Sequence, residues 1–220
     1  MNNIETSTIT EKVMEESTKG TVVLSFGDGN GKTVFINAGV HGNELASIAA
    51  TFKLINTLSN RNIINGKIYV ICDLCPYTGS TSTRYYNGQN LNSVANVDGT
   101  ISNNLIKLTE NLKTDYLGDF HCTQPGGNPG KDTVFGTYNP TVESSTIANY
   151  IAEKAKVNKI IYQKAGTEYG GAVEDISNIR GTPSVTCEVL TPHGTIRSGS
   201  VDTSYNMMLK LIEYAGITLN

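Results

Sequence analysis

The stretch KTVFINAGVHGNELASIAATFKLINTLSN, residues 32–60, decides the fold because it joins a strand directly to a helix. Its first part, KTVFINA (32–38), is rich in β-branched and aromatic residues and predicts a strand. From about Asn43 onward, apolar residues recur at helical spacing and give one apolar face: Leu45, Ile48, Ala49, Phe52 and Ile55. A strand followed by a helix is the repeating unit of α/β folds.

The rest of the chain repeats this alternation. Strands are expected at 21–26, 67–74, 116–121, 132–137, 159–163 and 182–190, and helices at 102–113, 141–156 and 200–215. The turn-like GDGNG between 21–26 and 32–38 predicts that these two strands form a hairpin. The run KIYVICDL (67–74) is apolar almost throughout, which is typical of a strand covered on both faces.

These elements predict one α/β domain with a mixed, largely parallel sheet and helices on both faces. We assign residues 1–19 to a loose lead-in and 20–220 to the domain. The long, polar and glycine-containing stretch 75–101 is expected to be a functional loop, because loops of that length in compact domains usually are.

The composition excludes several classes of function. The chain has 220 residues, a net charge of −3 and 17% charged residues, so it lacks the basic balance of a general nucleic-acid binder. No run of about 18 apolar residues is present, so we expect no membrane span. The N-terminal segment lacks the apolar core of a signal peptide. As written, the chain is expected to be cytoplasmic, or secreted if a leader has been removed.

Two of the three histidines follow predicted strands directly. His41 comes after 32–38 and His121 ends 116–121, and ligands gather beyond the carboxyl ends of strands in open α/β sheets. Glu44 lies three residues after His41, with the flexible Gly42 between them, so an imidazole and a carboxylate can converge on one ion. His41, Glu44 and His121 would form a two-histidine, one-glutamate set, which is typical of hydrolytic zinc sites with a fourth position for water.

Glu188 is the candidate general base. It lies in the otherwise apolar strand TPSVTCEVL (182–190), where a carboxylate is costly unless it is paired or functional. Partial burial would raise its pKa toward the range that proton transfer needs. Glu168, Glu174 and Asp175 compete for this role, but they lie in a polar, glycine-rich stretch that explains them without one.

Each of these residues also has a purely structural interpretation. A short His-x-x-Glu pattern arises by chance, and His121 can be an ordinary histidine at a strand end. Glu188 can be an ion-pair partner of an arginine. His193, in TPHG, is interpreted as a loop residue and held as the reserve ligand. Cys72 and Cys75 form a lone CxxC without a second pair, which favours a core position for Cys72 over a zinc site.

Taken in order along the chain, these segments resemble the zinc carboxypeptidases and their relatives, the succinylglutamate desuccinylase/aspartoacylase group. GVHGNE (39–44) matches the first metal motif of these enzymes, GDFHC (118–122) resembles the second-histidine motif, and SVTCEVL (184–190) resembles the strand with the catalytic glutamate. CPYTGSTSTRYYNGQNLNSVAN (75–96) is similar to their middle loop, with Pro76 and Arg84 in place. The resemblance covers about residues 32–195 and implies the zinc carboxypeptidase fold.

The resemblance also implies a role for several residues. One zinc ion would be held by His41, Glu44 and His121. Arg84 would polarise the scissile carbonyl and Asn92 would bind a substrate carboxylate or amide. Asp119 would orient a ligand from outside the metal site, and Tyr169 would supply a phenol from a shifted position.

The chain departs from the family pattern at three positions. Ser93 replaces the arginine that clamps a substrate carboxylate, and a hydroxyl cannot form that bidentate ion pair unless Arg180 or Arg197 reaches the site. Asn90 replaces an outer aspartate, and Gly166 stands where carboxypeptidases have a tyrosine.

Three functional hypotheses follow. The first is a zinc peptidase of the carboxypeptidase type that acts on a small peptide, including an unusual or cell-wall one. The second is an N-acyl amino acid deacylase. The third is a non-catalytic zinc-binding interaction domain, which an intact Glu188 disfavours because a binding module needs no base.

Overall fold

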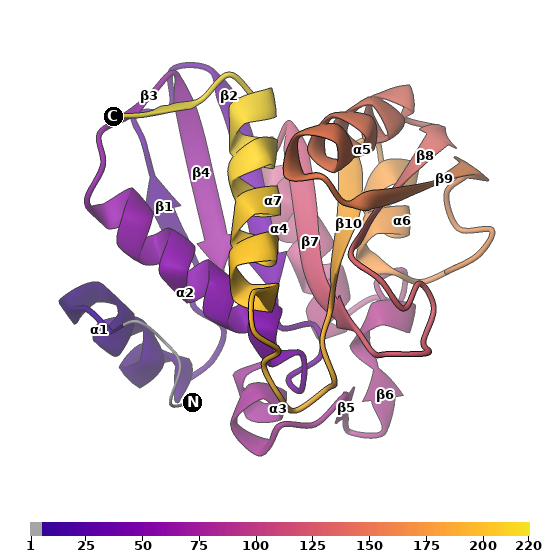
Figure 1. Ribbon diagram of the computed structural model, residues 1–220, viewed down its shortest axis with the longest axis horizontal. Helices are drawn as coiled ribbons and strands as arrows, with labels where there is room; N and C mark the ends of the chain where they lie inside the picture. The colour runs from indigo at the N-terminus through magenta and orange to yellow at the C-terminus, as the bar shows by residue number, and fades with distance from the viewer. Residues whose placement is uncertain (1–5) are drawn as a thin grey trace.

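A seven-stranded mixed sheet runs through the protein (Figure 1). The computed structural model describes residues 6–220, and across these residues the strands lie in the order β1 (Leu24–Phe26), β4 (Gly66–Ile71), β2 (Lys32–Ala38), β7 (Tyr116–Thr123), β10 (Ser184–Leu190), β8 (Thr133–Asn139) and β9 (Asn158–Lys164). The four central strands β4, β2, β7 and β10 are parallel, as are β8 and β9, whereas β1 and β8 join their neighbours β4 and β10 antiparallel. The predicted fold class is confirmed.

Helices cover both faces of this sheet. On one face lie α2 (Leu45–Ser59), α5 (Val142–Ala155) and α7 (Ser200–Tyr214), and on the other lie α4 (Ile101–Asn111) and α6 (Val173–Ile179) (Figure 1). The remaining elements are the helices α1 (Thr8–Ser17), α3 (Pro76–Thr81) and η1 (Leu91–Ser93) and two small sheets that pair β3 (Ile63–Ile64) with β11 (Thr218–Leu219) and β5 (Tyr85–Tyr86) with β6 (Gln89–Asn90).

Two apolar cores result, one on each side of the sheet. Strand β2 shows why: Val34 and Ile36 point into the core beneath α2 and α7, while Phe35 between them points into the core beneath α4 and α6. Successive side chains of a strand point to opposite faces, so a strand covered on both sides must be apolar at every position. In β10 the same alternation sends Val185 and Val189 to the first core and leaves Glu188 on the opposite face.

The hairpin predicted for residues 21–26 and 32–38 is wrong. β1 pairs with β4, antiparallel, and β4 lies between β1 and β2. The turn composition of residues 27–31 is real, but the segment carries the chain across β4 and does not close a two-stranded pair. Parallel pairing with β4 and β7 gives β2 a buried neighbour on each side, which a hairpin at the sheet edge would not provide.

Most of the described part of the predicted lead-in is structured. Residues 8–17 form α1, whose N-terminus has a capping box between Ser7 and Thr10, and Val13 is buried in the core beside α2. Residues 1–5 of the predicted lead-in lie outside the described residues. Within residues 6–220, no helix combines the length and the apolar character that crossing a membrane requires.

Candidate metal centre

The carboxyl ends of β2 and β7 bring His41, Glu44 and His121 together. The loop after β2 turns at Gly39, whose φ is +73°, and a Cβ at Gly42 would lie 2.0 Å from the carbonyl carbon of Thr78. The chain can pass there only because position 42 has no side chain. The Glu44 N–H donates to the His41 carbonyl oxygen at 3.2 Å, which folds the two side chains to the same side just before α2 begins.

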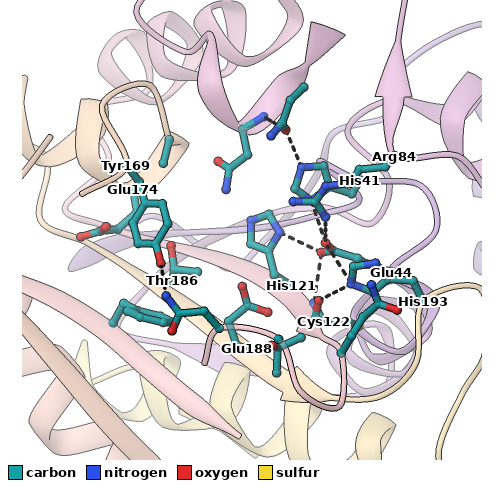
Figure 2. Close-up of a pocket in the computed structure, with 18 residues that line it drawn as sticks. His41, Glu44, Arg84, His121, Cys122, Tyr169, Glu174, Thr186, Glu188 and His193 are labelled. Carbon is teal, nitrogen blue, oxygen red and sulfur yellow. Dashed lines mark hydrogen bonds and ion pairs between the residues drawn. The ribbon is translucent and has the colours of Figure 1, made fainter. Parts of the chain in front are cut away.

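The three side chains are buried and nearly touch (Figure 2). His41 Nδ1 lies 2.7 Å from Glu44 Oε1, and His121 Nδ1 lies 2.8 Å from Glu44 Oε2. One ligand atom from each residue fits within 4.8 Å of the others. The backbone N–H of Cys122 also donates to Glu44 Oε2, at 3.0 Å, and fixes the carboxylate from the β7 side.

The outer ring nitrogens of both histidines are held by acceptors. His41 Nε2 lies 2.7 Å from Asn90 Oδ1, which also accepts the backbone N–H of Asn92 and is therefore an oxygen in an accepting role. His121 Nε2 lies 2.8 Å from the carboxylate of Asp119. Both Nε2 atoms therefore carry the hydrogen, and each Nδ1 faces the cavity with its lone pair whenever the ring is neutral.

This donor set fits a divalent metal ion. Two imidazole nitrogens and a carboxylate are typical zinc ligands, and metal-binding histidines almost always donate their second N–H to an outer acceptor. The Nδ1 atoms face carboxylate oxygens at hydrogen-bond distance, so a positive charge must lie between them, either as protons or as a metal ion. The expected outer roles of Asp119 and Asn90 agree with these contacts.

The electrostatics of the cluster show the same demand for positive charge. Burial alone would raise the pKa of Glu44, but the charges of His41 and His121 outweigh it and hold that pKa well below its usual value. Burial alone would lower the pKa of His121, yet the carboxylates of Asp119 and Glu44 raise it well above its usual value. The site is built to hold cations beside a buried anion.

Glu188 lies beside this cluster because β10 is the parallel neighbour of β7. Its Cα is in register with that of His121, and its side chain lines the cavity (Figure 2). Among the described residues, its Oε2 is buried and has no hydrogen-bond partner. Burial raises the pKa of Glu188 to about 8, against the opposing charge of His121. The structure therefore brings the four residues on which the sequence-based hypothesis depends into one cavity.

Arg84 enters the cavity from the loop before β5. Its Nη1 donates to Glu44 Oε1 at 2.9 Å, and about a third of the side chain stays exposed. The guanidinium is thus near the candidate metal ligands, with further N–H groups available to a bound molecule. The stretch 75–101 from which it comes is not a single loop as expected, because it contains α3, the β5–β6 pair and η1.

The cavity has a volume of about 410 Å³ and extends away from the histidines. Tyr169 lies at its other side, where Asn128 donates to the phenol oxygen at 3.2 Å. Asn92 also lines the cavity, and its Oδ1 accepts a hydrogen bond from the backbone N–H of Val173 at 2.9 Å. The lining residues are His41, Glu44, Arg84, Asn90, Asn92, His121, Cys122, Thr123, Gln124, Gly127, Asn128, Phe135, Tyr169, Ala172, Glu174, Thr186, Glu188 and His193.

Some lining residues had no usable signal in the sequence. Gln124 and Asn128 come from the TQPGGNPGK loop, where polar residues are ordinary. His193 lies in a loop, as expected, and this reserve ligand donates from Nε2 to the Cys122 carbonyl oxygen at 2.8 Å and lies 3.8 Å from Glu44 Oε1. The sequence offered one signal for His193, its position shortly after the strand that contains Glu188.

The CxxC cysteines and Arg180, which the sequence analysis also considered, do not line the cavity. The four cysteines are free and buried, so the CxxC residues Cys72 and Cys75 are core residues, as expected for Cys72. Arg180 pairs with Glu110, outside the cavity lining.

Residues 30–128 match the family model of the succinylglutamate desuccinylase/aspartoacylase catalytic domain. The chain therefore resembles this family over the segment that carries all three candidate metal ligands, and the resemblance inferred from the motifs is confirmed. No curated protein matches the chain by sequence.

Solved structures share the fold of this chain at low sequence identity. A succinylglutamate desuccinylase/aspartoacylase from Rhodobacter sphaeroides is 17% identical with a TM-score of 0.68, over 89% of this chain and 58% of its own. The tripeptide-bound cell shape determinant Csd4 from Helicobacter pylori is 11% identical with a TM-score of 0.72, over 91% and 57%. The ectoine utilization protein EutE (DoeB) from Ruegeria pomeroyi is 16% identical with a TM-score of 0.71, over 90% and 61%.

This chain thus spans about three fifths of the length of the structures that it matches. At these identities the likeness shows a shared fold and nothing further.

Proposed function

We propose that this protein is a zinc-dependent hydrolase of an amide bond, with a small peptide or an N-acyl amino acid as its substrate. The observation that carries the proposal is that a candidate metal-ligand cluster and a candidate general base lie in one cavity. Three typical zinc ligands, His41, Glu44 and His121, face one another, and the carboxylate of Glu188 stands beside them with one buried oxygen that has no partner.

The cluster supports metal binding because one donor atom from each of the three residues lies within 4.8 Å of the others. His41 Nδ1, His121 Nδ1 and the Glu44 carboxylate would hold the ion, while Asn90 and Asp119 keep both rings oriented. A zinc ion supplies hydrolysis with a lowered water pKa, near 7, and with polarisation of the substrate carbonyl.

Glu188 would act as the general base and then as the general acid. In its ionised form it accepts a proton from the attacking water, and it then gives that proton to the departing amine nitrogen. Burial raises the pKa of Glu188 above its usual value, which makes this carboxylate a stronger proton acceptor than a solvated one. The oxygen without a partner is the atom available for this exchange.

Arg84 would stabilise the negative charge that develops on the carbonyl oxygen. Its guanidinium lies at the edge of the ligand cluster and bonds Glu44 with only one of its N–H groups in the contacts described. A preorganised cation in a partly buried cavity can supply a few kcal/mol of transition-state stabilisation.

Peptidase and deacylase activities differ in substrate and share this machinery. The fold likeness to Csd4, whose structure was solved with a tripeptide bound, favours testing peptides, and the family match favours testing N-acyl amino acids. Turnover of one panel separates these two hypotheses. Zinc binding without turnover of either panel would support the third, a non-catalytic zinc-binding domain.

The substitution Glu188→Gln tests the proposal. The zinc-loaded variant should keep one zinc ion per chain by metal analysis and lose about 10²- to 10⁴-fold in kcat, because the shape is retained and the base is removed. Glu168→Gln, in an exposed loop outside the cavity, is the matched control and should leave kcat unchanged. Full activity of Glu188→Gln would refute this mechanism.

A further inference from the structure

The cavity has two chemically different ends. His41, Glu44, Arg84 and His193 lie on one side of it, and Tyr169 lies on the other with Glu174 and Thr186, as Figure 2 shows. We call the side formed by Tyr169, Glu174 and Thr186 the far end. It includes Asn128, which donates to the Tyr169 phenol, and Asn92, which accepts from the backbone N–H of Val173 next to Glu174. If a scissile carbonyl sits at the metal ligands, one flanking part of the substrate occupies the far end.

The far end contains no cationic side chain among the described residues. Arg84 is the only lysine or arginine in the cavity lining, and it is paired with Glu44 at the opposite side. Ser93 is exposed and lies outside the cavity lining, and its hydroxyl donates to the carbonyl oxygen of Asn90 at 2.8 Å.

Arg180 and Arg197, the two arginines that the sequence offered as alternative carboxylate-binding residues, have other partners. Arg180 pairs with Glu110 at 3.2 Å. Arg197 donates from Nε to the carbonyl oxygen of Leu190 at 2.7 Å and lies 3.8 Å from Asp132. Neither arginine lines the cavity.

Neutral amides and a buried acid line the far end instead. The Oδ1 of Asn92 already accepts a backbone N–H, so its NH₂ group is the half available to a ligand. Glu174 is almost fully buried, and one of its oxygens accepts from Asn178 at 2.7 Å. Burial and the neighbouring Asp175 raise the pKa of Glu174 well above its usual value. The Glu174 side of the far end is therefore either neutral or negative.

A substrate carboxylate would bind poorly in such surroundings. Moving an ionised carboxylate out of water is costly unless a cation or several donors replace the lost hydration. A carboxamide in the same place carries no charge and can exchange hydrogen bonds with amide and hydroxyl groups.

We propose that this hydrolase selects substrates whose part at the far end carries no free carboxylate, such as a C-terminal amide or a peptide that continues beyond the cavity. The proposal rests on the amide-hydrolase function above and narrows its substrate class.

Binding to a variant that cannot turn over substrate tests the selectivity separately from catalysis. Zinc-loaded Glu188→Gln is titrated calorimetrically with a panel of N-acetyl dipeptides, each as the free acid and as the C-terminal amide. The amide of the best-binding pair should bind at least about tenfold more tightly, which corresponds to about 1.4 kcal/mol. Equal affinities, tighter binding of the acid, or no measurable binding of any amide would overturn the proposal.

A gain of function provides the second arm. Asn128→Arg places a cation at a residue that lines the far end and should shift the ratio of affinities toward the free acid by at least about tenfold, while Asn128→Gln adds bulk without charge and should not. A ratio that is the same in both variants would overturn the assignment. Tighter amide binding without turnover by the wild-type enzyme would count against the hydrolase function alone and leave the selectivity supported.

Discussion

The substitution Glu188→Gln should make the metal-free protein more stable at neutral pH, although the zinc-loaded variant should lose most of its activity. Burial raises the pKa of Glu188 from its ordinary 4.5 to about 8 in the folded state. Between these two values the folded state binds more protons than the unfolded state, so stability falls as pH rises. Glutamine has nearly the same shape and never ionises, so the variant escapes this loss.

The magnitude follows from the two pKa values. Each unit of pH between them costs the folded wild-type protein about 1.4 kcal/mol. Glutamine should therefore gain about 3 kcal/mol over glutamate between pH 4 and pH 7, and about 5 kcal/mol at pH values above 8. The change with pH is the decisive quantity, because replacing a carboxyl with an amide also has a constant effect.

Urea denaturation of chelator-treated protein measures this difference. The free energy of unfolding is determined for the wild type and for Glu188→Gln at pH 4, 5.5, 7 and 8.5. Glu168→Gln, which changes an exposed carboxylate, should follow the wild type at every pH. A difference between wild type and Glu188→Gln that stays constant from pH 4 to 8.5 would refute the reasoning, because it would mean that the carboxylate is well solvated.

Three further predictions concern the metal centre and the loop that builds it. His121→Ala should lose zinc on dialysis, whereas His193→Ala should keep it, as metal analysis of both proteins will show. Asp119→Asn should weaken zinc affinity by about 10- to 100-fold in a competition assay, because the outer partner that orients the His121 ring loses its charge. Gly42→Ala should lower the free energy of unfolding by more than about 2 kcal/mol in urea, because the new methyl group would overlap the backbone of Thr78.

The candidate metal ligands could be identified from the sequence because each follows a strand with a strong local pattern. The apolar runs before His41 and His121 indicate buried strands, and parallel strands end at the same edge of a sheet. Glu188 was detectable for a related reason, since a carboxylate in an apolar strand needs an explanation. The family resemblance added Arg84, Asn92 and Tyr169, which line the cavity.

Other features were not accessible to local patterns. The predicted hairpin of residues 21–26 and 32–38 failed because turn composition records where a chain bends and carries no information on which strand it joins. The helix α6 was missed because it is short and follows a glycine-rich turn. The contact of His193 was not predictable, because its partner, the Cys122 carbonyl oxygen, is 71 residues away in sequence.

The sequence by itself determined the alternation of strands and helices, the two-sided burial of the central strands and the residue types of the candidate ligands, because these depend on periodicity and on the chemistry of single residues. Only the tertiary structure decided the order of the strands, the 2.7 and 2.8 Å contacts between Glu44 and the two rings, and the lack, within residues 6–220, of a cation at the far end of the cavity. Those properties depend on which distant segments become neighbours, and that is settled by packing across the whole sheet.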